Sequence, residues 1–175
     1  RTPRADDAMA GQGSRIVVDI GNSRLKWGKV DSVGKLIWAT SLPFDRPNLE
    51  SEFKELCRGI PADSSIAVSS VNPPVASKLE ALLKEGCDRA RSAGEGVPIV
   101  HWYRSAADVP VPHELEFPQT AGADRALAVA AARAILPSGM AGQVVSCGTA
   151  ITIERINEKG IWQGGAIAPG FLVAA

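Results

Sequence analysis

The sequence predicts an α/β protein in which a βββαβα domain is followed by the start of a second, duplicated domain. Three strand patterns come first, within residues 15–41, and helix and strand patterns then alternate up to residue 102. The second half opens again with two strands joined by a glycine turn, at residues 143–157. Since no residue-level repeat accompanies this recurrence, the duplication is predicted from the order of the elements.

The opening strands are predicted from the alternation of their side chains. Residues 15–20 (RIVVDI) form a β-branched run that is typical of a buried strand, and a Gly-Asn-Ser turn follows them. In residues 24–30, Leu25 and Trp27 alternate with Arg, Lys and Gly, which predicts the half-buried second strand of a hairpin. Residues 35–41 (KLIWATS) supply a third strand.

A helix and a strand follow this meander. Residues 48–58 carry apolar side chains at helical spacing, with Asn48 as the expected N-cap and Gly59 as the expected end. Residues 64–71 (SSIAVSSV) are typical of a buried strand, which an Asn-Pro-Pro sequence ends.

The next helix is expected to start at Pro74, to cover residues 75–84 and to end at Gly86. Residues 97–102 (VPIVHW) predict a further strand. Residues 105–114 are rich in Ala, Pro and other loop formers, so a loop is expected there.

The second half begins with the alanine-rich residues 123–136, which predict a helix. Three strands are then predicted, at residues 143–147, 150–157 and 160–167. The expected organisation is a disordered tail at 1–14, a first domain at 15–118, and an interdomain helix with the truncated start of a second domain at 119–175. The last residues (GGAIAPGFLVAA) predict the first turn of another helix, and a stop inside an apolar segment is typical of a fragment.

Composition excludes several classes of partner. Among 175 residues, 19 Lys and Arg balance 19 Asp and Glu, and no basic run is present, which argues against nucleic acid and anionic membrane as partners. Three separated cysteines without a C-x-x-C pair predict neither disulfides nor a zinc site and favour a reducing cytoplasm. No apolar stretch approaches the roughly 20 residues of a membrane-spanning helix. A small molecule or a protein is the expected partner.

The first candidate site is the turn after the first strand, residues 19–23 (DIGNS), with Lys26 beyond it. A carboxylate at the end of a buried strand can hold a metal ion, glycine lets a phosphate approach the backbone, and lysine adds positive charge. The alternative is an ordinary hairpin turn of the Gly-Asn type, which requires no ligand.

A second glycine turn, residues 146–150 (SCGTA), again joins two strands and offers backbone amides and a threonine hydroxyl. A tight turn is again the alternative. The presence of two such hairpins in one chain favours a phosphate site over two ordinary turns. In that interpretation, duplicated domains hold the phosphates of a nucleotide between them. Residues 164–170 (GGAIAPG) allow close approach of a ligand or another chain, or form an ordinary strand-to-helix connection.

The head of the alanine-rich helix is the third candidate site. There Asp124 can act as a general base toward a substrate hydroxyl, and Arg125 offers a planar fork for a substrate carboxylate. The alternative is that Asp124 caps the helix or complements its dipole, and that Arg125 is solvated. Motifs for the P-loop, the dinucleotide fold and the serine-hydrolase elbow are absent from the sequence.

Five motifs taken in order make the chain resemble the type III pantothenate kinases, a family related to the Bvg accessory factor. They are DIGNSRLK, SSVNP, PQTAGADR, SCGTAIT and GGAIAPG, and the resemblance covers residues 16–171. It implies an actin/Hsp70/sugar-kinase-like (ribonuclease H-like) fold and a homodimer. It also implies phosphorylation of pantothenate to 4′-phosphopantothenate with ATP and Mg²⁺, the first step toward coenzyme A.

The resemblance assigns roles to individual residues. The phosphate contacts would be Asp19, Ile20, Gly21, Asn22, Ser23, Arg24, Leu25 and Lys26, with Thr149 as a second nucleotide contact. Asp19 would reach Mg²⁺ through the phosphates, and Asp124 would be the catalytic base. The pantothenate contacts would be Gly122, Ala123, Asp124, Arg125 and Leu115.

Two positions depart from the family's pattern. Ser146 stands where the family usually has an aspartate associated with a monovalent cation (K⁺ or NH₄⁺), and a neutral hydroxyl is a poorer cation ligand than a carboxylate. Leu115 stands where the family usually has a substrate-contacting tyrosine, so a phenolic hydrogen bond is lost there. Because of these departures, an alternative function remains, in which the chain is a catalytically impaired regulatory relative that binds pantothenate or nucleotide without turnover. A kinase or phosphatase of the same superfold acting on a sugar or polyphosphate is a further alternative, which the GADR segment disfavours.

Overall fold

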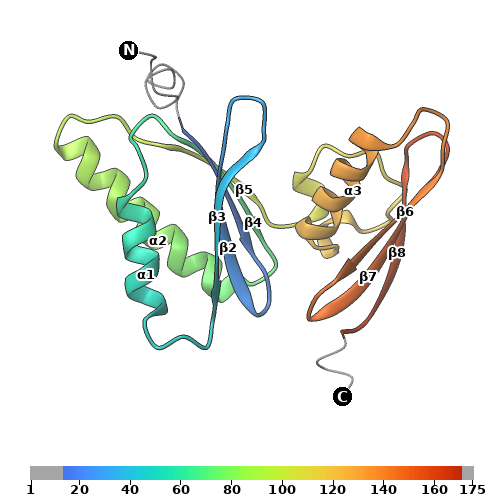
Figure 1. Cartoon of the computed structure of the whole chain (residues 1–175), viewed down its shortest axis with the longest axis horizontal. Helices are drawn as coiled ribbons and strands as arrows, with labels where there is room; N and C mark the ends of the chain where they lie inside the picture. The colour runs from blue at the N-terminus through green and yellow to red at the C-terminus, as the bar shows by residue number, and fades with distance from the viewer. Residues whose placement is uncertain (1–13, 171–175) are drawn as a thin grey trace, which may run out of the picture. The chain divides into compact units, whose positions relative to one another are not determined.

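The computed structural model describes residues 14–170, which divide into two compact units (Figure 1). Within these residues, the first unit comprises 14–68 and Asn72–Trp102, and the second comprises Ser69–Val71 and 103–170. The expected tail before Ser14 and the expected helical turn after Gly170 lie outside the described residues. The expected domain boundary near residue 118 stays a prediction.

A five-stranded sheet forms the centre of the first unit. Its strands are β1 (Arg15–Ile20), β2 (Arg24–Val30), β3 (Leu36–Pro43), β4 (Ser65–Ser70) and β5 (Ile99–Tyr103), in the order β3-β2-β1-β4-β5. Strands β1, β2 and β3 form the predicted antiparallel meander, and the bounds of β1 and β2 agree with the prediction. The register places Asp19 of β1 opposite Lys26 of β2.

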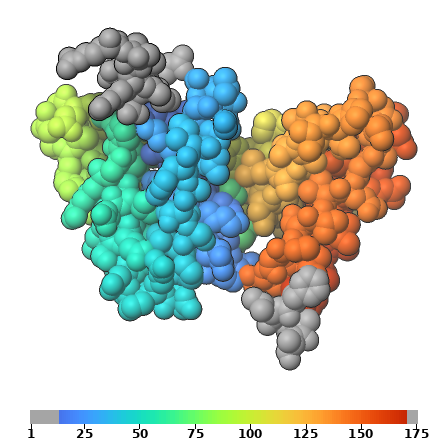
Figure 2. Space-filling view, in the orientation of Figure 1, coloured from blue at the N-terminus to red at the C-terminus, as the bar shows by residue number. Residues whose placement is uncertain are grey.

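Two helices, α1 (Leu49–Arg58) and α2 (Pro73–Ser92), lie side by side on one face of this sheet (Figure 1). The alternation expected from the sequence buries one face of β1 against them, while the edge strand β3 stays largely exposed at the surface seen in Figure 2. The buried apolar core comprises Ile16, Val18, Ile20, Leu25, Trp27, Leu42, Phe53, Ile66, Val68, Ala76, Leu79 and Leu83.

The predicted end of the second helix at Gly86 is wrong, since α2 continues to Ser92. An interior glycine costs a helix only about 1 kcal/mol, and Arg89, Ala90 and Arg91, which follow it, are good helix formers. The helix stops before Gly94, whose φ of 73° ends it. At the other end, the Asn72 side chain accepts a hydrogen bond from the Val75 amide at 3.3 Å, so Asn72 is the N-cap that precedes the two prolines.

The second unit packs one helix on a three-stranded antiparallel sheet. The helix is α3 (Ala123–Ile135), and the strands β6 (Gly142–Cys147), β7 (Ala150–Ile156) and β8 (Trp162–Pro169) lie in the order β6-β7-β8. Short 3₁₀ turns at Ala106–Asp108 and Pro118–Thr120 precede α3, where the sequence predicted only loop over the first of them. The core between helix and sheet is built on Ala106, Val109, Val111, Ala126, Val129, Ile156 and Trp162.

The element order confirms the predicted fold class. The first unit has the βββαβα order, extended by β5, and the second unit opens a new antiparallel strand unit after α3. The fold is thus of the α/β class, with a five-stranded sheet in the first unit and a three-stranded sheet in the second. In the part of the chain that the structure describes, no helix is long and apolar enough to cross a bilayer.

Candidate functional site

The first glycine turn connects β1 to β2 and is held by its own backbone. The Gly21 amide donates to the carbonyl of Arg24 at 3.0 Å, and the Phe44 amide donates to the carbonyl of Ser23 at 3.0 Å. Residues 22–24 are exposed. The turn therefore presents polar side chains and backbone to solvent in a fixed geometry.

Two residues of the predicted phosphate loop serve the core instead. The side chains of Ile20 and Leu25 are fully buried, so only their backbone atoms remain for a ligand. Ile20 lies at the end of β1 and Leu25 near the start of β2, so the turn between them is fixed on both sides by a side chain packed in the core. As predicted phosphate contacts, Ile20 and Leu25 could therefore act only through their backbone atoms.

Asp19 and Lys26 form an ion pair across the two strands. Lys26 Nζ donates to Asp19 Oδ2 at 2.9 Å, and the side chains are 61% and 39% exposed for Lys26 and Asp19. Both groups reach solvent beside the turn, where an exposed pair is worth little and can open at small cost. In residues 14–170 no group of three His, Cys, Asp or Glu side chains could hold a metal ion by itself. One carboxylate is nevertheless enough for Mg²⁺ that is held mainly by phosphates.

Asp124 lies at the head of α3, with an exposed carboxylate that is turned toward the helix start. Its Oδ1 accepts a hydrogen bond from the Arg125 amide at 2.8 Å. The preceding Gly122 leaves the space that this carboxylate needs, because a Cβ there would lie 2.4 Å from Asp124 Oδ1 and 3.1 Å from a methyl group of Val71. Ala123 is the first residue of α3, and its side chain is fully buried.

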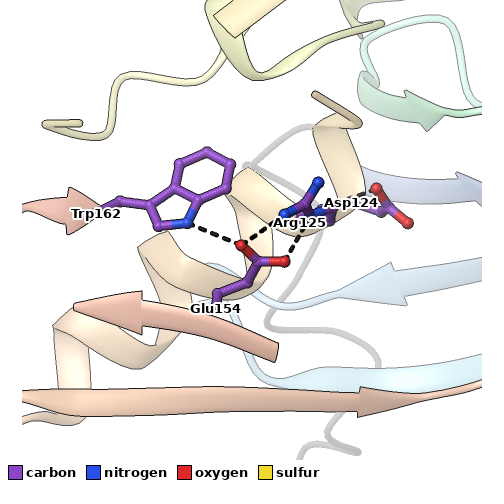
Figure 3. A network of polar contacts seen from close by, with 4 residues as sticks. All are labelled: Asp124, Arg125, Glu154 and Trp162. Atoms are coloured by element: carbon purple, nitrogen blue, oxygen red, sulfur yellow. Dashed lines mark hydrogen bonds and ion pairs between the residues drawn. The ribbon is translucent and has the colours of Figure 1, made fainter. Parts of the chain in front are cut away.

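Arg125 enters a polar network that the sequence did not predict (Figure 3). Its Nε and Nη2 both donate to the carboxylate of Glu154, the Nη2 bond measuring 2.9 Å to Oε2. The indole Nε1 of Trp162 donates to the same Oε2 at 2.9 Å, and the guanidinium carbon lies 5.9 Å from the centre of the indole ring. The alternative that Arg125 is solvated is wrong, since its side chain is only 15% exposed and that of Glu154 is 1% exposed.

The second glycine turn joins β6 to β7. Ser146 lies opposite Thr152, and both are two residues along their strands from the pair Val144 and Glu154. Because side chains alternate along a strand, Ser146 and Thr152 lie on the same face of the sheet as Glu154. The exposed Thr149 accepts a hydrogen bond at its carbonyl from the amide of Gly170 at 3.0 Å.

The glycine-rich end of β8 packs tightly against this turn. A Cβ on Gly165 would lie 1.9 Å from the carbonyl oxygen of Ile153 and 2.7 Å from Glu154 Oε2, and a Cβ on Gly170 would lie 2.1 Å from the carbonyl oxygen of Gly148. These glycines therefore permit close approach between strands of this chain.

Leu115 is half-buried and belongs to the edge of the second core. One of its methyl groups lies 3.3 Å from the position that a Cβ on Gly164 would occupy, and its amide donates to His113 Nδ1 at 3.3 Å. The turn with Asp19 belongs to the first unit, whereas Leu115, residues 122–125, Ser146 and Thr149 all belong to the second.

The chain has remote likenesses among solved structures. The chain is 11% identical to a Ppx/GppA phosphatase of Aquifex aeolicus, with a TM-score of 0.46 over 91% of this chain and 53% of that one. It is 12% identical to the acetate kinase of Porphyromonas gingivalis, with a TM-score of 0.39 over 90% of this chain and 57% of that one. Likenesses this remote have no bearing on function.

Sequence relatives are much closer. The chain is 33% identical over 156 residues to the type III pantothenate kinase of Halorhodospira halophila, which covers 89% of this chain and 59% of that protein. It is 34% identical over 161 residues to the type III pantothenate kinase of Synechococcus elongatus, covering 90% of this chain and 57% of that protein. The chain thus spans somewhat more than half the length of these relatives. A family model described as type III pantothenate kinase matches residues 15–175, and the chain therefore belongs to the type III pantothenate kinase family.

Proposed function

We propose that this chain is the part of an ATP-dependent pantothenate kinase that supplies the catalytic base and a large share of the substrate contacts. The reaction would transfer the terminal phosphoryl group of ATP to the primary hydroxyl of pantothenate. Family membership supports this proposal, together with one observation in the second unit. A solvent-accessible carboxylate, Asp124, directly precedes a guanidinium, Arg125, that a buried partner holds in place.

Asp124 is the proposed general base. Its carboxylate is exposed at the head of α3, with one oxygen oriented by the Arg125 amide at 2.8 Å. A base held in this way can take the proton of a substrate hydroxyl as the oxygen attacks phosphorus. Arg125 would bind the carboxylate at the other end of pantothenate, and the orientation gained from two anchored ends would supply much of the rate.

The two glycine turns are the proposed phosphate contacts. Gly21, the exposed residues 22–24 and Lys26 would bind the phosphates in the first unit, and Thr149 would bind them in the second. Mg²⁺ held by the phosphates and Asp19 would neutralise charge that develops during transfer. Asp19 fits this role because it is partly exposed and its present partner, Lys26, can turn to the phosphates instead. Leu115 would give apolar packing in place of a hydrogen bond.

Ser146 leads us to propose little dependence on K⁺ or NH₄⁺. Its hydroxyl is exposed opposite Thr152, so this position offers a monovalent cation two neutral oxygens and no carboxylate. We also propose a homodimer, as the family resemblance implies, that works in the cytoplasm, as the three separated cysteines favour. The same Ser146, with Leu115, favours the second candidate function, a regulatory relative that binds pantothenate without turnover.

The test is ATP-dependent phosphorylation of pantothenate by the full-length natural protein, its Asp124→Asn variant and an Asp63→Asn control. Asp63 is an exposed carboxylate of the first unit, so the control carries the same chemical change away from the site. We expect a fall in kcat of about 10²- to 10⁴-fold for Asp124→Asn and no change for the control. Replacing Na⁺ by K⁺ or NH₄⁺ should change kcat less than about 3-fold. Pantothenate binding without turnover in every salt would favour the regulatory relative instead.

A further inference from the structure

The guanidinium of Arg125 is held along one edge only. Nε and Nη2 donate to Glu154, whereas Nη1 makes no hydrogen bond within residues 14–170 and points away from Glu154 in Figure 3. A guanidinium bound through two nitrogens to a fixed carboxylate cannot rotate in its plane. The direction in which Nη1 projects is therefore set by Glu154.

Glu154 is itself fixed from several sides. Its side chain is 1% exposed, and its two oxygens accept three hydrogen bonds, two from Arg125 and one from the indole of Trp162. Trp162 is fully buried in the second core, so the indole cannot move away. Gly165 brings the β8 backbone so close that a Cβ there would lie 2.7 Å from Glu154 Oε2. A buried charge with this many partners is retained at one place.

We infer that Glu154 is a positioning residue, which aims the outer nitrogen of Arg125 at the carboxylate of the substrate. The inference rests on the proposed function, since it concerns how the pantothenate site is built. Glu154 acts through Arg125 and need not touch the substrate. Trp162 supports it by holding Oε2 and by packing its ring beside the guanidinium.

Two opposing effects decide what loss of the Glu154 charge does. Arg125 released from Glu154 would carry an uncompensated charge, which strengthens its attraction of a carboxylate about 4 Å away by about 5-fold where bulk water screens the two groups. It would also lose its orientation, and an oriented hydrogen bond between charged groups is worth about 10- to 100-fold in binding. Orientation is the larger effect, so removal of the charge should weaken recognition of the carboxylate.

The test compares Glu154→Gln with wild type in the full-length protein on two substrates, pantothenate and its neutral primary amide. We expect kcat/KM for pantothenate to fall about 10- to 100-fold and kcat/KM for the amide to fall less than about 3-fold. A purely structural role for Glu154 would lower both values equally. Glu158→Gln, the same change at an exposed turn of the same unit, should alter neither.

A milder variant covers the case in which Glu154→Gln folds poorly. Trp162→Phe removes the indole N–H but keeps the Glu154 charge, and we expect a smaller loss that is again confined to pantothenate. Equal losses on both substrates, or a gain on pantothenate, would overturn the inference for either variant.

A second measurement separates this inference from the proposed function. Exchange of the Arg125 Nε proton with water, followed by NMR, should be slow in the wild-type protein and at least about 10-fold faster in Glu154→Gln. A wild-type protein that phosphorylates neither substrate would refute the proposed function, and the exchange rate would still decide whether Glu154 holds Arg125. Unchanged exchange in the variant would refute the positioning role.

Discussion

Replacing Gly122 by alanine should separate the placement of the proposed base from the stability of the fold. Gly122 has φ −63° and ψ 142°, which alanine adopts without strain, so the backbone itself tolerates the change. The obstacle is the neighbouring carboxylate, because the new methyl group would lie 2.4 Å from Asp124 Oδ1. The variant therefore acts on the side chain that the proposed mechanism needs.

The magnitude follows from that distance. Carbon and oxygen normally approach to about 3.3 Å, so the Asp124 oxygen must retreat by about 0.9 Å. An exposed carboxylate can do so at a cost of about 0.5–1.5 kcal/mol in side-chain strain, and the reduced freedom of the unfolded chain offsets about 0.4–1 kcal/mol. The free energy of unfolding should stay within about 1 kcal/mol of wild type. A displacement of nearly 1 Å at a catalytic group lowers kcat about 100-fold.

The assay is pantothenate-dependent formation of ADP, with thermal unfolding of the same samples. Gly86→Ala is the matched control, because no heavy atom lies within 4 Å of its new methyl group and the position is interior to α2. The control should gain about 0.5–1 kcal/mol in stability and keep its kcat. Wild-type kcat in Gly122→Ala would refute the reasoning, since the proposed base would then work from another position.

Three further predictions concern other parts of the chain. Gly165→Ala would place a methyl group 1.9 Å from a backbone carbonyl oxygen of β7, so urea unfolding should show a loss of about 3 kcal/mol or more, and a loss below about 1 kcal/mol would contradict the close strand approach. Burial raises the pKa of the Cys57 thiol to about 11, so at pH 8 iodoacetamide should modify Cys57 far more slowly than the exposed Cys147, as peptide mass spectrometry would show. Hydrogen bonds from the backbone amides of residues 104 and 105 lower the pKa of Asp108, so its stabilisation is complete above the usual value near 4 and is lost as the pH falls through the lowered one. Because solvent screens this exposed carboxylate, Asp108→Asn should cost only about 0.5 kcal/mol at pH 7 and progressively less in acid, whereas a difference independent of pH would contradict this role.

The strands of the first unit could be predicted because the signal for each is local. In β1 and β2 the burial pattern follows the alternation of apolar and polar residues, and the predicted bounds agree with the structure. The end of α2 could not be predicted in the same way. Gly86 and Gly94 both resemble helix ends in the sequence, but only Gly94 adopts a positive φ, and that choice depends on packing along the whole helix.

The candidate site likewise has residues that a local motif could identify and one whose role depends on distant contacts. Motifs identified Asp124 and Arg125 at a helix start, and the structure places them there. Glu154 was missed because its burial depends on Arg125, which lies 29 residues away, and on Trp162. The available signal was weak, since Glu154 shares its strand face with the buried Ile156 and an acidic residue at such a position usually faces solvent. A buried charge becomes visible only when its partner is known.

The two glycine hairpins differ in charge at corresponding positions, where one has an aspartate and the other a serine. Asp19 and Ser146 each stand two residues before the glycine of their turn. Asp19 lies opposite Lys26, which neutralises it at 2.9 Å, whereas Ser146 lies opposite Thr152, which carries no charge. A carboxylate at position 146 would thus face a hydroxyl and would need a cation from solution, while serine removes that need. The small cation dependence that we propose therefore follows from the strand pairing around Ser146 as well as from the residue itself.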